Sequence, residues 1–304
     1  MATITGTGRV AARRAERRAA TLPYALLVPA AVALAAVSVY PLVSGIRASF
    51  TRFRYGRIVG SAGLQNYQNV LHDQTFWSAI RVTAKFVAIA VTVETLLGLL
   101  LALLVVREVP GTRFIRLSLI LPMTVAPVVV GVIWRLMYAS GTGLVNPMFA
   151  HLGLGAPDVL SHPGTAFYGL VLVDVWEWTP LLFLIILAGL QSLPQDPIEA
   201  AAIDGAGPLR TFFDHTLPLL SPVLFVGVIL RLIDAIGTFD QIFVLTRGGP
   251  GTATQLISIY GYNTAFNFTQ YGQAAAMLIS LLAFVLLLIG AAIGMMRRSA
   301  RRTA

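Results

Sequence analysis

The chain has 304 residues, of which 57% are hydrophobic and only 12% are charged, so it is far more apolar than a typical soluble domain. It contains no cysteine, which excludes disulfides, thiolate nucleophiles and cysteine-ligated metal sites. Its net charge of +9 does not indicate nucleic-acid binding, because the basic residues form short groups that flank long apolar runs. The composition predicts an all-α integral membrane protein whose solvent is the lipid bilayer.

The first apolar run follows a basic N-terminal stretch, an order that is also found in secretory signals. However, the uncharged window between Arg18 and Arg47 exceeds the roughly 20 residues needed to cross a bilayer. It ends in Tyr40-Pro41 instead of a small-residue cleavage site. We therefore expect residues 1–22 to be a retained basic tail that precedes the first transmembrane helix.

Apolar windows of about 20 residues recur along the chain, and they predict six transmembrane helices. Together they form one predicted transmembrane domain, residues 23–296, followed by a second basic tail, residues 297–304. The predicted spans are residues 23–46, 82–106, 114–138, 166–190, 219–245 and 271–296.

The distribution of basic residues predicts the orientation of these spans. Six crossings put both termini on one side, where thirteen Arg residues would lie, against seven Arg and Lys residues on the other side. Because cytoplasmic loops are enriched in positive charge, both termini are expected in the cytoplasm. The outside loops would be residues 47–81 and 139–165, and residues 191–218 would face the cytoplasm. The arginines within residues 47–57 oppose this bias.

Several residues inside the spans are expected to have structural roles. Glu94 and Arg135 are each alone on their helical face and could pair within the bundle. The prolines at 122, 127 and 180 are expected to kink their spans. The four histidines are scattered, so we predict no metal site and no catalytic residues.

The fourth and fifth spans stand out because they carry ionisable residues. A charge at the bilayer centre costs on the order of 3 kcal/mol, so such residues usually face a wet cavity or a partner. Carboxylates, a guanidinium and an indole would suit a sugar, whose hydroxyls form hydrogen bonds and whose ring packs on aromatic faces. The alternative is a set of structural ion pairs, for example Arg231 with Asp234 or Asp174. The predicted substrate-pathway residues are Asp174, Glu177, Trp178, Arg231, Asp234, Ala235 and Thr238.

The loop between these two spans contains signals for a short helix. Asp196 can cap its start, Pro197 suits its first turn, and Glu199 can reach back to the cap amide. The helix should stop at Asp204-Gly205, where glycine can adopt the left-handed conformation, and a second short helix should begin at Pro208. The alanines of the first short helix could dock into a groove on another protein, or simply pack against the ends of the spans.

Residues 199–207, with the sequence EAAAIDGAG, resemble the EAA loop of permease subunits in binding-protein-dependent ABC importers. The resemblance extends over nearly the whole chain and favours the carbohydrate-uptake branch, in the form of its maltose-type first permease. Arg247 departs from that pattern, which has a small or polar residue there. The further segments that carry the resemblance are 63–67 with Phe76-Trp77, 121–134, Phe212-Phe213, 217–220 and 239–250.

This resemblance implies a coupling loop that sits in a cleft of a cytoplasmic ATPase. The implied partners are a second permease subunit, two ATP-binding-cassette ATPases, an extracytoplasmic solute-binding protein and a sugar, all at a bacterial or archaeal cell membrane. The chain itself has no G-x-x-x-x-G-K-[ST] motif, so ATP hydrolysis and any cofactor are expected elsewhere. The positions that the resemblance assigns to coupling are Glu199, Ala200, Ala201, Asp204 and Gly205.

In the maltose-type relative, residues on the two charged spans contact the sugar, which implies a similar location for the pathway here but not the same side chains. An ion-coupled secondary transporter would also carry acids and an arginine at mid-membrane. The EAA-like loop discriminates against it, because such a transporter has no use for a coupling loop. A membrane enzyme is a third possibility, but the sequence offers it no nucleophile–base pair.

Overall fold

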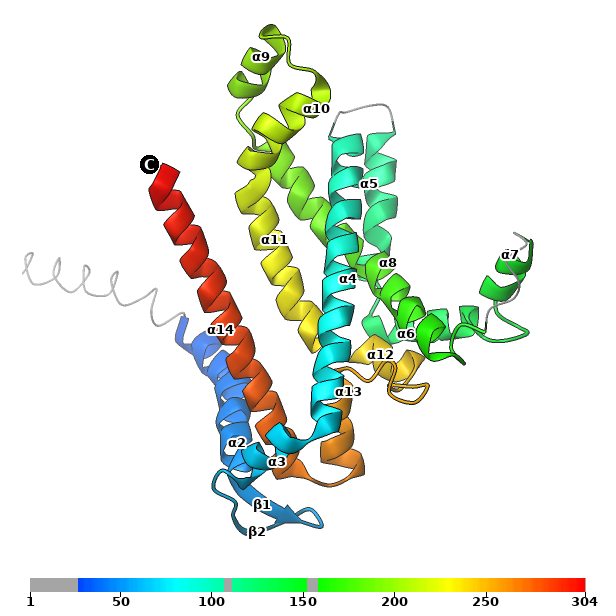
Figure 1. Ribbon diagram of the computed structural model, residues 1–304, viewed down its shortest axis with the longest axis vertical. Helices are drawn as coiled ribbons and strands as arrows, with labels where there is room; N and C mark the ends of the chain where they lie inside the picture. Colours follow the sequence, from blue (N-terminus) through cyan, green and yellow to red (C-terminus); the bar gives the residue numbers. More distant parts are fainter. Residues whose placement is uncertain (1–26, 107–110, 152–157, 304) are drawn as a thin grey trace, which may run out of the picture.

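The computed structural model describes residues 27–106, 111–151 and 158–303, and they form a bundle of long helices with short elements at both ends (Figure 1). The N-terminal half contains a helix at Leu27–Ser49 whose last part is α2 (Tyr40–Ser49), strands β1 (Thr51–Arg54) and β2 (Arg57–Ser61), and helices α3 (Gln65–His72), α4 (Gln74–Val105), α5 (Thr112–Ile120), α6 (Pro127–Met137) and α7 (Val145–His151). The C-terminal half contains α8 (Pro163–Gln191), α9 (Asp196–Ile203), α10 (Pro208–Thr211), η3 (Phe212–Thr216), α11 (Leu217–Gly237), α12 (Asp240–Leu245), α13 (Ile257–Tyr262), η4 (Asn263–Asn267) and α14 (Tyr271–Thr303).

Five helices in the described residues are long and apolar enough to cross a membrane, and a sixth crossing results if the bent α5–α6 pair counts as one span. The six-span prediction is therefore confirmed with this pair included. The first predicted tail and residues 23–26 lie outside the described residues. At the other end, α14 continues to Thr303, seven residues beyond the predicted end of the last span.

The predicted third span is wrong as a single helix. Its first half, α5 and the 3-10 turn η2 (Leu121–Thr124), meets α6 at an angle of 96°. The residue before each proline is disfavoured in helical conformation, and Ala126, directly before Pro127, is extended with ψ 136°. Two prolines five residues apart thus produce a break, whereas the single Pro180 leaves α8 continuous through 29 residues.

The predicted fifth span is also too long. Helix α11 ends at Gly237, Thr238 has the extended ψ of 124°, and α12 then starts as a separate helix that packs against α6. Gly131 permits this contact, because a Cβ atom at this position would lie 3.0 Å from the Gln241 carbonyl oxygen. The two broken spans therefore meet each other beside the central helices.

The predicted outside loop of residues 47–81 is largely structured. It contains the β1–β2 hairpin, α3 and the first turns of α4, which begins eight residues before the predicted start. Asp73 caps α4 by accepting a 2.8 Å hydrogen bond from the Thr75 amide, and it also accepts one from the Tyr260 hydroxyl. Partial burial, together with this carboxylate, raises the pKa of Tyr260 to about 12. The cap thus also joins α4 to α13.

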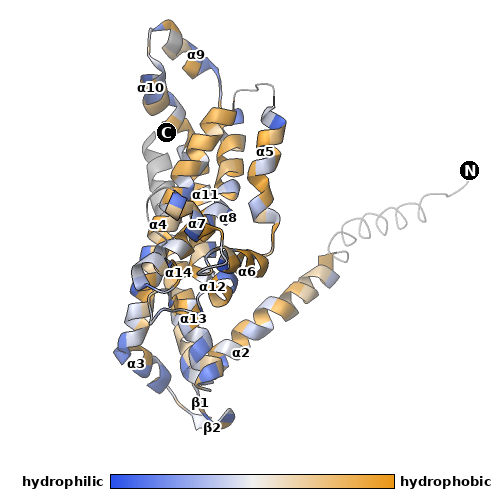
Figure 2. Cartoon of the chain, turned by 90° about the vertical axis from the view of Figure 1, so that its right-hand side faces the viewer, coloured by the Kyte–Doolittle hydropathy of each residue, from blue (hydrophilic) through white to orange (hydrophobic). Residues whose placement is uncertain are grey.

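Several short elements lie at the two ends of the bundle, outside the stretch that the long helices would span in a membrane. Helices α9 and α10 and the C-terminal end of α14 lie at one end, and the hairpin, α3 and α13 lie at the other (Figure 1). The helix at Leu27–Ser49 leans away from the bundle, and none of its most apolar 18-residue window is buried (Figure 2). Such exposed apolar surface is expected where lipid or another protein subunit replaces water.

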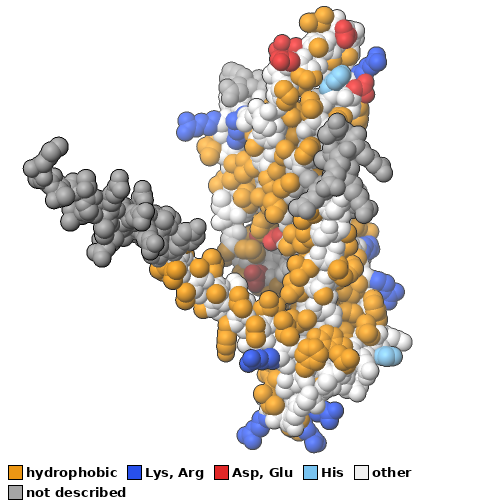
Figure 3. All heavy atoms as spheres, turned by 90° about the vertical axis from the view of Figure 1, so that its left-hand side faces the viewer, with side chains coloured by type: hydrophobic (Ala, Val, Ile, Leu, Met, Phe, Trp, Pro, Cys, Tyr) orange, Lys and Arg blue, Asp and Glu red, His pale blue; other side chains and the backbone are white. Residues whose placement is uncertain are grey.

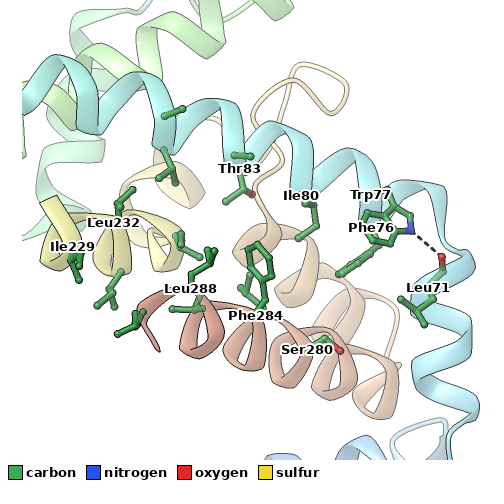
Figure 4. Close-up of a pocket in the computed structure, with 18 residues that line it drawn as sticks. Leu71, Phe76, Trp77, Ile80, Thr83, Ile229, Leu232, Ser280, Phe284 and Leu288 are labelled. Carbon is green, nitrogen blue, oxygen red and sulfur yellow. Dashed lines mark hydrogen bonds between the residues drawn. The ribbon is translucent and has the colours of Figure 1, made fainter. Parts of the chain in front are cut away.

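A groove of about 630 Å³ lies between α4, α11 and α14 (Figure 4). Thr83 and Ser280 are hydroxyl-bearing members of its otherwise largely apolar lining, and the Thr83 hydroxyl already binds the Ala79 carbonyl and the Ile257 amide. A sugar would leave its hydroxyl groups unsatisfied there. The groove is therefore chemically unsuited to be the substrate site.

Candidate functional site

A buried charge network lies where α4, α8 and α11 meet, and Arg231 is its centre. Arg231 is fully buried and forms a two-pronged ion pair with Glu94, at 2.7 Å through Nε and 3.1 Å through Nη2. Its Nη2 also pairs with Asp174, and its Nη1 lies 2.9 Å from Asp234. One guanidinium therefore fixes three helices relative to one another, in the planar fork geometry that suits arginine.

The network extends to α12 and to an aromatic ring. The Gln241 amide donates a 2.5 Å hydrogen bond to the second oxygen of Asp174. The Arg231 guanidinium carbon also lies 5.3 Å from the centre of the Trp178 ring, which is within cation–π range. Gln241 thus ties α12 to the network. The break between α11 and α12 brings this polar side chain, which lies beyond the end of α11, to the centre of the bundle.

Two polar atoms near the network have no hydrogen-bond partner among the described residues. They are Oε2 of Glu177 and Oε1 of Gln241, and both residues are about 1% exposed. Native proteins pair nearly all buried polar atoms, so an unpaired acceptor is an informative exception. Oε1 of Gln241, which lines the cavity beside the network, can accept a hydrogen bond from a donor that enters the site.

A cavity of about 350 Å³ adjoins the network. In Figure 3 acidic side chains are visible at the bottom of a recess in an otherwise hydrophobic face. An aromatic ring beside hydroxyl, amide and carboxylate groups is a lining that can hold a sugar. The residues that line the cavity are Pro127, Trp178, Ile233, Asp234, Gly237, Thr238, Phe239, Asp240 and Gln241.

The predicted pathway residues separate into two groups. Trp178, Asp234 and Thr238 line the cavity. Asp174, Arg231 and Ala235 are fully buried and Glu177 nearly so, and these four are not part of its lining. The alternative interpretation of Arg231, as the partner of Asp234 or Asp174, describes contacts that are present, and both pairs form at once.

Six of the nine residues that line the cavity, and one ion-pair partner, are not among the predicted site residues. Three of them, Phe239, Asp240 and Gln241, lie inside the predicted fifth span and in the segment that carries the family resemblance. The break at Thr238 turns them toward the cavity, and hydropathy does not predict that break. Glu94 was predicted to pair within the bundle, but its partner could not be named, because 137 residues separate it from Arg231. Arg135 donates to the Val244 carbonyl at 3.1 Å and so links α6 to α12.

The loop between α8 and α11 forms the two predicted short helices. The first begins one residue earlier than expected, since the Gln195 carbonyl accepts the amides of Ile198 and Glu199. It ends as predicted at Gly205, which has φ +77°, and the Ala206 amide donates to the Ala201 carbonyl at 2.9 Å. This six-to-one hydrogen bond with a left-handed glycine is a Schellman motif.

The loop presents most of its coupling positions to the outside. Glu199, Ala200, Asp204 and Gly205 are exposed, whereas Ala201 is buried at 5%. Ile203 is 87% exposed at the end of α9, although it is a large apolar side chain. An exposed isoleucine next to alanines on a projecting helix is typical of a surface that another protein covers.

Comparison with known proteins agrees with these features. A family model for the inner membrane component of binding-protein-dependent transport systems matches residues 94–304. The trehalose/maltose transport system permease protein MalF of Thermococcus litoralis is 44% identical over 226 residues, 74% of this chain and 76% of its own length. The trehalose transport system permease protein SugA of Mycobacterium tuberculosis is 34% identical over 278 residues, 91% of this chain and 87% of its own.

A solved structure also shares the fold. The crystal structure of a bacterial ABC transporter involved in the import of the acidic polysaccharide alginate aligns with a TM-score of 0.81, covering 94% of this chain and 99% of the other. A second structure of a bacterial alginate ABC transporter, in complex with an alginate pentasaccharide-bound periplasmic protein, aligns with a TM-score of 0.80. Both are 22% identical in sequence to this chain, so they bear on its fold alone.

Proposed function

Because the chain belongs to the family of binding-protein-dependent transport system inner membrane components, we propose that it is a permease subunit of an ATP-driven sugar importer. The observation that carries this proposal is the projecting helix α9, whose largely exposed EAA-like sequence lies between α8 and α11, two of the three spans that hold the charge network. The named substrates of the similar permeases, trehalose and maltose, support a sugar as the cargo.

The proposed coupling surface is the exposed side of α9. Glu199, Ala200, Asp204 and Gly205 are exposed and would seat this helix in a cleft of a cytoplasmic ATPase, with the buried Ala201 behind them. The small alanines permit close approach of a partner backbone, and the Schellman turn at Gly205 fixes the angle at which the chain returns to the membrane. The chain has no phosphate-binding loop of its own, so two separate ATPases would supply hydrolysis.

The same loop connects directly to the proposed pathway. Helix α8 enters the loop and α11 leaves it, and these helices carry Trp178 and Asp234, which line the cavity. A movement of α9 would therefore be transmitted to the cavity along two rigid helices, which is what alternating access requires. With a second permease subunit, this cavity would form the sugar pathway, and Asp174, Glu177, Arg231 and Ala235 would support it from behind.

The proposed orientation puts both termini and the α9–α10 loop in the cytoplasm of a bacterial or archaeal cell, with residues 1–22 and 297–304 as basic tails around the transmembrane domain of residues 23–296. The excess of basic residues on that side supports it. The hairpin, α3 and α13 would then face an extracytoplasmic solute-binding protein.

Reconstitution tests this function against an ion-coupled transporter. The chain would be purified with its partner permease, ATPases and binding protein, and uptake of radiolabelled trehalose and maltose into proteoliposomes would be measured. We expect uptake that needs ATP and the binding protein and that survives ionophores. Uptake that follows an ion gradient without ATP would instead assign the carboxylates to ion coupling.

A further inference from the structure

We propose that the cavity beside Trp178 admits neutral and amino saccharides and excludes saccharides that carry a negative charge. This inference rests on the proposed sugar-import function and adds the charge class of the substrate. Two carboxylates, Asp234 and Asp240, line the cavity, and its described lining contains no Lys or Arg. The field in a cleft lined by one sign of charge concentrates ligands of the opposite sign and repels those of the same sign.

The nearby arginine does not cancel this field. Arg231 is fully buried, and its guanidinium already contacts the carboxylates of Glu94, Asp174 and Asp234. Asp240 lies exposed in the first turn of α12, and its carboxylate forms no hydrogen bond or ion pair with another described residue. Asp234 remains 48% exposed although one of its oxygens pairs with Arg231. Negative charge therefore exceeds positive charge at the wall of the cavity.

An unpaired polar atom in the cavity lining indicates the same kind of ligand. Gln241 lines the cavity and is about 1% exposed. Its amide nitrogen donates a hydrogen bond to Asp174, whereas its Oε1 has no hydrogen-bond partner among the described residues. This atom accepts hydrogen bonds, so the ligand must bring donors. Hydroxyl and ammonium groups provide such donors. A carboxylate, sulfonate or phosphate would instead place further hydrogen-bond acceptors against the acceptor in the cavity wall.

Charged thiol reagents can measure this field, because the chain has no cysteine of its own. Gly237→Cys places a thiol at the cavity wall, where a Cβ atom would meet nothing within 4 Å. The rates of modification by a trimethylammonium, a sulfonate and an uncharged methanethiosulfonate would be compared with those of a small thiol in solution. We expect the cationic-to-anionic rate ratio to rise roughly tenfold above the solution value.

Matched neutralisations identify the source of the field. Asp240→Asn should lower the rate ratio several-fold, whereas Asp214→Asn, which removes an exposed acid beside Arg210, should leave it unchanged. A ratio equal to that of the solution thiol, or one insensitive to Asp240→Asn, overturns the proposal. Failure of the uncharged reagent to reach both Gly237→Cys and Thr238→Cys also overturns it, because the cavity would then be closed to water.

Uptake by the complete importer tests the substrate class itself. A neutral disaccharide, a glucosamine disaccharide and a disaccharide with one uronic acid would be compared as radiolabelled substrates. We expect entry of the first or second and none of the third. Entry of the uronate at the rate of the neutral sugar would refute the charge class and leave the sugar-import function standing. If no saccharide enters while the rate ratio is raised, the sugar-import function fails instead.

Discussion

The α9–α10 loop connects α8 and α11, two of the three helices that hold the charge network around Arg231, but the loop and the network are built in opposite ways. The network is buried, and its arginine is surrounded by three carboxylates. The loop exposes Glu199, Ala200 and Ile203, and its turn is held by backbone hydrogen bonds. We therefore expect substitutions in the buried part of the network to destabilise the fold, whereas the exposed side of the loop is free to bind a partner. Substitutions in the two regions should therefore fail in different ways.

The largest effect is expected when Arg231 is replaced with leucine. Removal of one partner from a buried ion pair typically costs about 3 to 5 kcal/mol, because the remaining charges stay buried without compensation. Thermal unfolding of the purified protein in detergent would measure the loss. Arg210→Leu is the matched control, since its i,i+4 pair with Asp214 is exposed and should change stability by less than about 1 kcal/mol.

The same network predicts which second substitution rescues this variant. Asp234→Asn should not restore Arg231→Leu, because the fully buried Glu94 and Asp174 remain charged and unpaired. The combination of Arg231→Leu with Glu94→Gln and Asp174→Asn should recover much of the stability. Full rescue by Asp234→Asn alone would show that the exposed pair, and not the buried ones, carries the interaction.

A smaller effect is expected at the contact that brings α12 to the network. Gly131→Val would place side-chain atoms against the Gln241 carbonyl at about 3.0 Å, and such overpacking typically costs about 1 to 3 kcal/mol. Gly290→Val is the control, because this glycine on α14 has open space around it. Equal melting temperatures for both variants would mean that α6 and α12 do not pack closely in the membrane.

Substitutions in the α9–α10 loop should act through the backbone conformation and not through side-chain packing. A Cβ atom at Gly205 or at Gly207 would meet nothing within 4 Å, but only Gly205 has a left-handed φ, +77° against −69° for Gly207. Gly205→Val should cost about 1 to 2 kcal/mol locally and distort the turn after α9. Co-purification of the ATPases should fall for Gly205→Val and persist for Gly207→Val. Equal recovery of the ATPases with both variants would show that the left-handed turn at Gly205 is not needed for coupling.

The elements that the sequence predicts best are those decided by local chemistry. Asp204-Gly205 predicts the end of α9, because only a residue without a Cβ atom adopts the left-handed turn easily. Apolar windows longer than about 20 residues likewise predict the spans, because the length of a local segment alone has to match the thickness of the bilayer. The sequence also indicates the ion pairs of Arg231 with Asp234 and Asp174 as one interpretation, because Asp234 lies one helical turn away and Asp174 lies on the other charged span.

What the sequence does not predict depends on long-range packing. Hydropathy continues through Pro122 and Pro127 and through Thr238, so it does not indicate where a span turns back into the protein. Those turns bring Gln241 to Asp174 across 67 residues and Asp240 to the cavity wall. A break inside an apolar window is tolerated only where neighbouring helices satisfy the backbone, and one sequence does not reveal those neighbours.

The smallest change in stability is expected at Trp178, where the effect should appear in transport instead. Trp178→Leu keeps an apolar side chain but removes the ring beside Arg231, which would cost about 0.5 to 1 kcal/mol, and it removes the flat face on which a sugar could pack. Trp176→Leu is the matched control two residues earlier on α8, because its ring contacts Trp134 and does not line the cavity. Sugar uptake at equal levels of assembled complex should fall for the first variant and persist for the second. If both variants lose uptake equally, the indole supports the helix and not the sugar, and the pathway has to be sought along α11 and α12.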